Sequence, residues 1–214
     1  MTAPTEDFIA RLRGACVVPV VTIDDADAAM PLARALLAGG IDVIEITLRT
    51  PAASEAIRRI AAELPQVAAG AGTVLSRAQA DDAVAAGARF LVSPGLTPAV
   101  AEIGLAATVP LLPGVATASE AMAAAERGFA FLKFFPAEAI GGAAALKALA
   151  APLPHLRFCP TGGIDAAKAA AYLALPNVVC VGGSWMAPPD AVRDGDWNRI
   201  TALSRAAFGL ADRR

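Results

Sequence analysis

A regular alternation of short apolar segments and alanine-rich segments along the whole chain most limits what this sequence can fold into. The apolar segments are rich in residues that favour strands, and they are apolar throughout, as expected of strands buried on both faces. The alanine-rich segments are typical of helices that pack on another layer. Eight strands are predicted in this way, at Cys16–Val21, Val43–Thr47, Val67–Ala71, Phe90–Val92, Val109–Leu112, Phe131–Phe134, Arg157–Pro160 and Val178–Val181.

The order of these segments predicts the fold. Repeated strand–helix units favour a parallel sheet, and eight units predict a (β/α)8 TIM barrel that spans residues 1–214 as a single domain, with an N-terminal helix and a closing helix near Trp197–Phe208. A doubly wound open sheet is the alternative, but no GxGxxG fingerprint opens the first helix. The helices expected between strands are Met30–Ala38, Ser54–Glu63, Gln79–Ala86, Ala99–Ala106, Glu120–Glu126, Ala143–Leu149 and Ala166–Leu173.

Two local signals support these helices. A weak internal repeat, starting at Leu36, Ala83 and Ala124, places a glycine between a helix end and the next strand. Helices often end in a left-handed conformation, which glycine adopts at little cost. Capping residues precede several helices. The expected caps are Thr50, Ser76, Thr97, Thr117 and Asp165.

Composition excludes several classes of protein. The formal net charge of −2 and the pI of about 5.4 leave no electrostatic footprint for nucleic acid or an anionic membrane. The N-terminal residues lack the apolar core of a signal peptide, and no uninterrupted apolar run reaches the roughly 18 residues of a membrane span. We therefore expect a cytoplasmic protein.

The three cysteines, Cys16, Cys159 and Cys180, lie in or beside apolar runs and are expected to be buried rather than paired or zinc-bound.

Lys133 is the most informative single residue. The other two lysines, Lys147 and Lys168, fall in alanine-rich helical stretches, whereas Lys133 lies in a predicted strand among phenylalanines. Desolvation there favours the neutral amine, which can attack a ketone to form an imine. Glu45 and Lys133 each lie five residues after the glycine of a repeat unit, so both are expected at the same level of the barrel. Glu45 would then move protons next to the imine.

Further polar groups follow the predicted strands, at the end where barrels of this kind keep their active sites. Arg49 is placed to hold a carboxylate, and Thr73 is a second candidate donor. Paired glycines follow the last two strands, in Thr161–Ile164 and in Gly182–Ser184. Their backbone N–H groups predict a phosphate site in these two loops.

A metal centre is not expected. The single histidine, His155, precedes the seventh strand and so lies at the wrong end of the barrel. No cluster of acidic residues, cysteines or histidines follows the strands, and no Ser–His–Asp set can be assembled.

Together these residues resemble the KDPG/KHG aldolase family, whose type reaction is cleavage of 2-keto-3-deoxy-6-phosphogluconate (KDPG). The resemblance covers nearly the whole chain, in order, and is weakest after Ala187. The stretches that carry it are Val18–Val20, Gly40–Pro51, Gly70–Val74, Phe90–Gly95, Leu112–Thr117, Lys133–Ala137, Pro160–Ile164 and Val181–Trp185.

The resemblance implies a class I aldolase that forms a Schiff base on Lys133, uses Glu45 as general acid and base, and releases pyruvate and D-glyceraldehyde 3-phosphate. It implies no metal and no cofactor, a phosphorylated keto sugar acid as the only partner, and a homotrimer. Thr161 resembles the gluconate-type branch of the family. The residues implied for substrate carboxylate and pocket are Arg49, Thr73, Pro94, Phe135 and Thr161, and those for phosphate are Gly162, Gly163, Gly183 and Ser184.

Three alternatives stay open at this stage. The first is an aldolase for the galactonate epimer or for 4-hydroxy-2-oxoglutarate. The second is a non-catalytic phosphosugar-binding barrel in which Lys133 and Glu45 form only an ion pair. The third is a phosphate-binding synthase barrel, which would share the glycine loops but would not explain Lys133 among phenylalanines.

Overall fold

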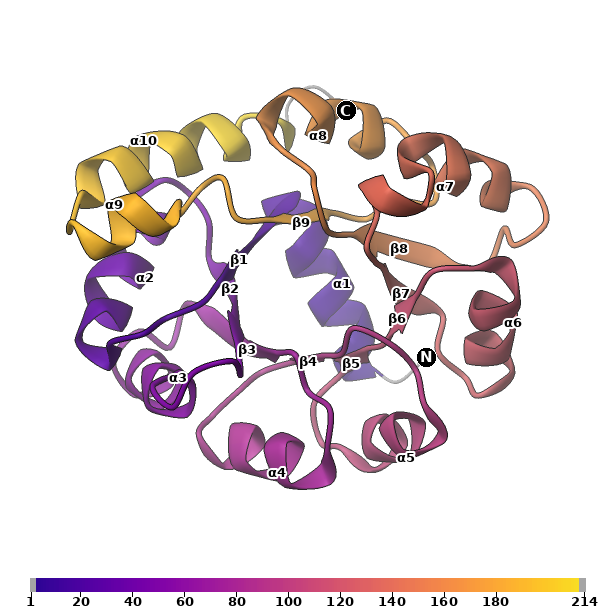
Figure 1. Cartoon of the computed structure of the whole chain (residues 1–214), viewed down its shortest axis with the longest axis horizontal. Helices are drawn as coiled ribbons and strands as arrows, with labels where there is room; N and C mark the ends of the chain where they lie inside the picture. The colour runs from indigo at the N-terminus through magenta and orange to yellow at the C-terminus, as the bar shows by residue number, and fades with distance from the viewer. Residues whose placement is uncertain (1–2, 212–214) are drawn as a thin grey trace.

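The computed structural model describes residues 3–211, in which strands and helices alternate from one end of the chain to the other (Figure 1). The predicted strand bounds at Val43–Thr47, Phe131–Phe134 and Arg157–Pro160 are confirmed, and the other strands are shifted or shortened. The strands are β1 (Val17–Val21), β2 (Val43–Thr47), β3 (Ala68–Gly72), β4 (Leu91–Val92), β5 (Leu111–Leu112), β6 (Gly114–Val115), β7 (Phe131–Phe134), β8 (Arg157–Pro160) and β9 (Val181–Gly183).

The helices lie outside the strands (Figure 1), as predicted for apolar strands buried on both faces. Every predicted helix is present, and Ala166–Leu173 and Trp197–Phe208 have the predicted bounds. The α-helices are α1 (Ala3–Ala15), α2 (Ala29–Ala38), α3 (Ala53–Glu63), α4 (Arg77–Ala85), α5 (Pro98–Ala106), α6 (Ala118–Glu126), α7 (Gly142–Ala150), α8 (Ala166–Leu173), α9 (Pro189–Arg193) and α10 (Trp197–Phe208), and the 3-10 helices are η1 (Ala26–Ala28) and η2 (Glu138–Ile140).

All strand pairs are parallel, and the strands form two curled sheets. Six strands pair in the order β5-β4-β3-β2-β1-β9, and three pair in the order β6-β7-β8. Pro113 separates β5 from β6, and it has no N–H to donate to a neighbouring strand. On the other side only the isolated bridges Phe158–Val178 and Thr161–Gly182 join β8 to the chain around β9. The predicted parallel α/β domain is therefore present, but its pairing is not one continuous ring of eight strands.

The repeat identified in the sequence ends helices in the expected way. Its glycines, Gly40, Gly87 and Gly128, have φ angles of +95°, +95° and +89°. L side chains rarely adopt this left-handed conformation, so glycine is the residue that ends these helices at least cost. Each turn delivers the chain to the strand that follows.

Most of the predicted helix caps are confirmed. The side chains of Ser76, Thr97, Thr117 and Asp165 each accept a hydrogen bond from a backbone N–H in the first turn of the helix that follows. The expectation for Thr50 is wrong, because α3 starts at Ala53 with no side-chain cap. The Thr50 hydroxyl instead donates to the carbonyl of Ile23, which ties the loop after β2 to the loop after β1.

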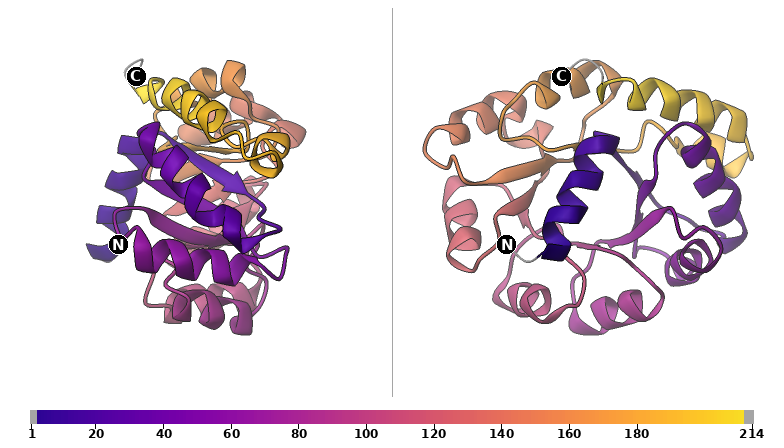
Figure 2. Two further views of the ribbon diagram at one scale, coloured as in Figure 1. Left: turned by 90° about the vertical axis from the view of Figure 1, so that its left-hand side faces the viewer. Right: turned by 180° about the vertical axis from the view of Figure 1, so that it is seen from behind.

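Two terminal helices close the structure. The predicted N-terminal helix α1 lies across the end of the strands where β1 begins (Figure 2), and its Phe8 ring lies 4.7 Å from the ring of Phe90. Helix α10 packs along α2, and the Thr201 hydroxyl donates to the Ala35 carbonyl at 3.0 Å.

No helix within residues 3–211 is long and apolar enough to cross a membrane. Cys16, Cys159 and Cys180 are buried, as expected.

Gly70 tests the packing of the strands. A Cβ atom at Gly70 would lie 2.3 Å from Cζ of the buried Phe90 ring. Gly70→Ala is therefore expected to lower the free energy of unfolding by about 1–3 kcal/mol through overpacking, measured by urea denaturation. Gly95→Ala is the matched control, because nothing lies within 4 Å of a Cβ there. Equal stabilities of the two variants would contradict this packing.

Thr73 tests the backbone strain at the end of β3. Its φ angle is +62°, which is unfavourable for a β-branched residue and costs about 1–2 kcal/mol. Thr73→Gly removes this strain at an entropic cost of about 0.5–1 kcal/mol, so we expect the free energy of unfolding to be kept or increased. The exposed loop residue Thr108 has no positive φ, so Thr108→Gly should lose about 0.5–1 kcal/mol. The prediction fails if urea titration shows the two variants equally destabilised.

Candidate active site

Lys133 and Glu45 form a buried ion pair between strands that are not neighbours in either sheet. Lys133 lies in β7 and Glu45 in β2, and the Lys133 Nζ atom donates to Glu45 Oε1 at 3.3 Å. Only 6% of Lys133 and 4% of Glu45 is exposed. The two side chains are therefore at the same level across the curled sheet, as the spacing from the repeat glycines predicted.

Small residues make room for this pair. A Cβ atom at Gly72 would lie 2.2 Å from Glu45 Oε1, so the carboxylate occupies the space that a side chain on β3 would fill. Gly114 is the pairing partner of Lys133 on β6, and a Cβ there would lie 2.2 Å from the Pro94 carbonyl oxygen. Pro94 thus lies beside the strand next to the lysine. The ring of Phe135 lies 5.2 Å from Lys133 Nζ and contributes a cation–π contact.

Arg49 and Thr73 meet at the end of β2 and β3. The Arg49 side chain is exposed, and its Nε donates to the Thr73 hydroxyl at 3.3 Å. Both residues follow strands that pair in register, so their side chains lie next to each other. The arrangement offers a guanidinium and a hydroxyl to one anionic group.

Two glycine pairs were expected to follow the last two strands, but only Gly162–Gly163 does so, after β8. Gly182 and Gly183 lie within β9, which ends at Gly183, and the two pairs lie side by side. Thr161 and Gly182 form a parallel bridge, and a Cβ at Gly182 would lie 2.3 Å from the Thr161 hydroxyl oxygen. Gly162 and Gly163 have φ angles of +106° and +77°, which turn the loop sharply just before α8. Such glycine-rich turns at a helix N-terminus expose N–H groups that bind anions.

A cavity of about 380 Å³ joins most of these groups. Neither Lys133 nor Glu45 lines it, but Phe135, which contacts the lysine, does. Thr73 does not line the cavity, but its hydroxyl accepts a hydrogen bond from Arg49, which does. The predicted site residues that line the cavity are Arg49, Phe135, Thr161, Gly162, Gly163, Gly183 and Ser184.

Sequence reasoning missed part of the lining of this cavity. Thr47 lies two residues after Glu45 in β2, so strand alternation would have placed it on the same face. Its hydroxyl lies 2.8 Å from that of Thr22, which follows β1, and Asp24 lies beyond. Helix α9, in the segment after Ala187 where the family resemblance is weakest, also contributes Pro189 and Val192. Pro189 at its start, Asp190 in its first turn and Arg193 in its last turn are the signals that could have marked this short helix.

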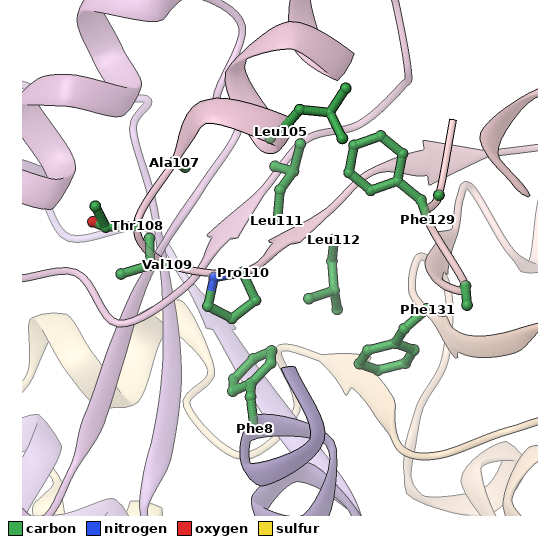
Figure 3. A pocket seen from close by; sticks show the side chains of 13 residues that line it. Phe8, Leu105, Ala107, Thr108, Val109, Pro110, Leu111, Leu112, Phe129 and Phe131 are labelled. Atoms are coloured by element: carbon green, nitrogen blue, oxygen red, sulfur yellow. The ribbon is translucent and has the colours of Figure 1, made fainter. Parts of the chain in front are cut away.

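A second cavity, of about 540 Å³, lies at the opposite end of the strands (Figure 3). It is bordered by Phe8 of α1 and by the segments that lead into β5 and β7, and none of the predicted site residues lines it. Its side chains are mainly apolar and include Leu105, Val109, Leu111, Phe129 and Phe131. The predicted site residues therefore lie in or beside the first cavity and not in the second.

This arrangement suits imine chemistry on a phosphorylated keto acid. A buried amine next to a carboxylate adjoins a cavity that is lined by a guanidinium group and by glycine-rich segments. His155 is exposed and lies before β8, away from these groups. Within residues 3–211, no three or more histidine, cysteine or acidic side chains gather as metal ligands would.

Comparisons with known proteins agree with this geometry. A family model described as KDPG and KHG aldolase matches residues 8–203. A 2-dehydro-3-deoxy-phosphogluconate aldolase from Dickeya dadantii is 52% identical over 195 residues, which cover 91% of this chain and 92% of that protein.

Two solved structures are also similar. The KDPG aldolase from Legionella pneumophila, solved with pyruvate captured as a covalent carbinolamine intermediate, is 46% identical with a TM-score of 0.91, and the match covers 96% of this chain and 98% of that one. The aldolase from Zymomonas mobilis ZM4, solved with 3-phosphoglycerate, is 46% identical with a TM-score of 0.89 over 96% of both chains. The buried lysine, the glycine loops and these similarities lead to one conclusion, that this chain belongs to the KDPG/KHG aldolase family.

Proposed function

We propose that this protein is a class I aldolase that cleaves 2-keto-3-deoxy-6-phosphogluconate to pyruvate and D-glyceraldehyde 3-phosphate. The observation that carries the proposal is the buried Lys133–Glu45 pair, at 3.3 Å, behind Phe135 and beside a cavity lined by glycines of two segments. The names of the relatives support the same reaction, and the pyruvate carbinolamine in the Legionella enzyme supports covalent chemistry. No cofactor takes part, because the lysine itself supplies the electron sink.

Lys133 starts the reaction by passing a proton from its ammonium group to the Glu45 carboxylate and attacking the keto carbon of the substrate with the neutral amine. Loss of water from the resulting carbinolamine gives a protonated imine. The bond between C3 and C4 then breaks as the C4 hydroxyl loses its proton, and the bonding electrons move into the imine to form an enamine. Protonation of the enamine at C3 and hydrolysis release pyruvate and restore the amine of Lys133.

Glu45 is the residue best placed to move these protons. Its carboxylate contacts Lys133 Nζ directly, and it is packed against Gly72, which limits the positions it can take. A group held this close to the nitrogen can accept and return protons at the carbinolamine and at the adjacent carbon, directly or through a water molecule. A general base in this position typically contributes about 10²–10⁴-fold to the rate.

The remaining site residues divide between the two ends of the substrate. Arg49 and Thr73 hold the carboxylate next to the keto group, with Pro94 and Phe135 shaping the wall beside the lysine. Thr161 contacts the middle of the substrate and favours the gluconate epimer. The phosphate binds to the N–H groups and the hydroxyl of the two loops, namely Gly162, Gly163, Gly183 and Ser184. The 3-phosphoglycerate in the Zymomonas structure supports a phosphorylated ligand.

Several wider features complete the proposal. We infer that the two sheets act as one closed (β/α)8 barrel, with β5 and β6 counted as a single strand interrupted at Pro113. The bridges between β8 and the chain around β9 support closure. Residues 1–214 then form one barrel domain with α1 at one end and α10 as the closing helix. Assembly as a homotrimer and a cytoplasmic location stay predictions.

Borohydride trapping tests the role of Lys133. With pyruvate present, reduction of the imine should leave a covalent adduct on Lys133, found by peptide mass spectrometry, because the reduced secondary amine no longer hydrolyses. Lys133→Met should form no adduct, while the exposed helical Lys147→Arg should react like the parent protein. Absence of an adduct at any lysine of the folded parent protein would reject the function.

Glu45→Gln tests the proton transfer. The substitution keeps the shape of the side chain but removes its basicity, so kcat for pyruvate release from KDPG should fall by about 100-fold or more. The KM should change less, because Glu45 does not line the cavity. An unchanged kcat would assign Glu45 a purely structural role.

Comparing kcat/KM of the parent protein on KDPG, its galactonate epimer and 4-hydroxy-2-oxoglutarate would assign the substrate.

A further inference from the structure

Three polar side chains behind the loop after β8 take no part in the reaction described above. The Tyr172 hydroxyl, from α8, donates a short hydrogen bond to Glu138 Oε1 in η2. Lys168, one turn earlier in α8, pairs its Nζ with Glu138 Oε2 at 2.9 Å. Tyr172 is only 1% exposed, so a hydroxyl in that position needs a partner. We call these residues the Glu138 cluster.

The Glu138 cluster is bonded directly to the glycine loop. Lys168 Nζ donates to the Gly163 carbonyl at 3.0 Å, and the Glu138 N–H donates to the Gly162 carbonyl at 3.1 Å. A Cβ at Gly163 would lie 2.8 Å from Glu138 Cβ, so the loop packs closely on this side chain. The next bond, from the Ala137 N–H to the Thr161 carbonyl at 2.8 Å, continues the same link. The segment that follows Lys133 is thereby tied to the loop after β8.

The hydrogen bonds from the Glu138 cluster fix the orientation of the Gly162 and Gly163 peptide units. Because the carbonyl groups of Gly162 and Gly163 are held by the cluster, these peptide units keep one orientation relative to η2 and α8. Both glycines have positive φ angles and could otherwise sample many conformations. None of the three cluster side chains lines the cavity, so they act on a bound phosphate only through the loop.

The charges of the cluster are mutually supporting. The hydrogen bond from Tyr172 and that from Lys168 lower the pKa of Glu138, so its carboxylate stays ionised at neutral pH. Burial, together with the bond to Glu138, raises the pKa of Tyr172, so its hydroxyl keeps the proton that it donates. The hydrogen bond to Glu138 raises the pKa of Lys168, so all three residues are in the protonation states that these hydrogen bonds need.

We propose that Glu138, Lys168 and Tyr172 are positioning residues that hold the Gly162–Gly163 loop in the conformation that binds the substrate phosphate. The inference rests on the proposed function, because it assigns that loop to phosphate. A preformed loop avoids the entropic cost of ordering two glycines when the phosphate binds. Loss of the cluster should weaken phosphate recognition while leaving the chemistry at Lys133 intact.

The test compares KDPG with the same keto acid lacking its phosphate. In Tyr172→Phe and Lys168→Met, kcat/KM for the phosphorylated substrate should fall by about tenfold, mainly through KM, as expected for the loss of one hydrogen bond to a charged group. The kcat/KM for the unphosphorylated substrate and the rate of pyruvate trapping at Lys133 should stay within about twofold of the parent values. Lys168→Arg, which keeps the cation, should restore most of the loss.

Glu138→Ala separates positioning from simple charge attraction. If Lys168 acted directly on the phosphate, freeing it from Glu138 would lower the KM for KDPG, and that result would overturn the inference. Positioning requires the KM to rise. An equal loss on both substrates, or no loss on KDPG, would overturn it as well. The proposed function is tested separately, since it fails if the parent protein traps no pyruvate on a lysine or does not cleave KDPG.

Discussion

The buried contact between Lys133 and Glu45 is the interaction on which the rest of the site depends. Two opposite charges, each less than a tenth exposed, are held at 3.3 Å between strands that do not pair with each other. Removing either partner would leave the other buried without compensation, which is costly. The pair therefore imposes a requirement on the whole fold, because β2 and β7 must face each other across the curled sheet with little freedom to shift.

Glycines in the neighbouring strands provide the space that this arrangement needs. Gly72 leaves space for the carboxylate, and Gly114 lets the strand beside Lys133 approach Pro94. The same device recurs where Gly182 makes room for Thr161. Glycines in the strands thus let Glu45, Pro94 and Thr161 pack closely against the backbone, while the positive-φ glycines Gly162 and Gly163 turn the chain sharply after β8. One residue type serves two different purposes at one end of the strands.

Much of the fold and the site could be predicted because the signals are local or repetitive. The apolar strands at Val43–Thr47 and Phe131–Phe134 and the caps at Thr117 and Asp165 follow from short-range chemistry. What could not be predicted depends on contacts distant in sequence. The strand pairing changes at Pro113, since β5 pairs with β4 and β6 pairs with β7. Thr50 donates to the Ile23 carbonyl and does not cap a helix.

The sequence by itself determined the alternation of strands and helices, the isolation of Lys133 among apolar residues and its equivalence with Glu45 in the repeat. These properties follow from residue type and spacing, which are fixed along the chain. Only the tertiary structure decided which side chains meet: the cavity beside the pair, the contribution of Thr22, Thr47 and α9, and the cluster that holds Gly162 and Gly163. Those contacts join residues far apart in sequence, and their geometry exists only when the sheet has curled and brought its loops to one end.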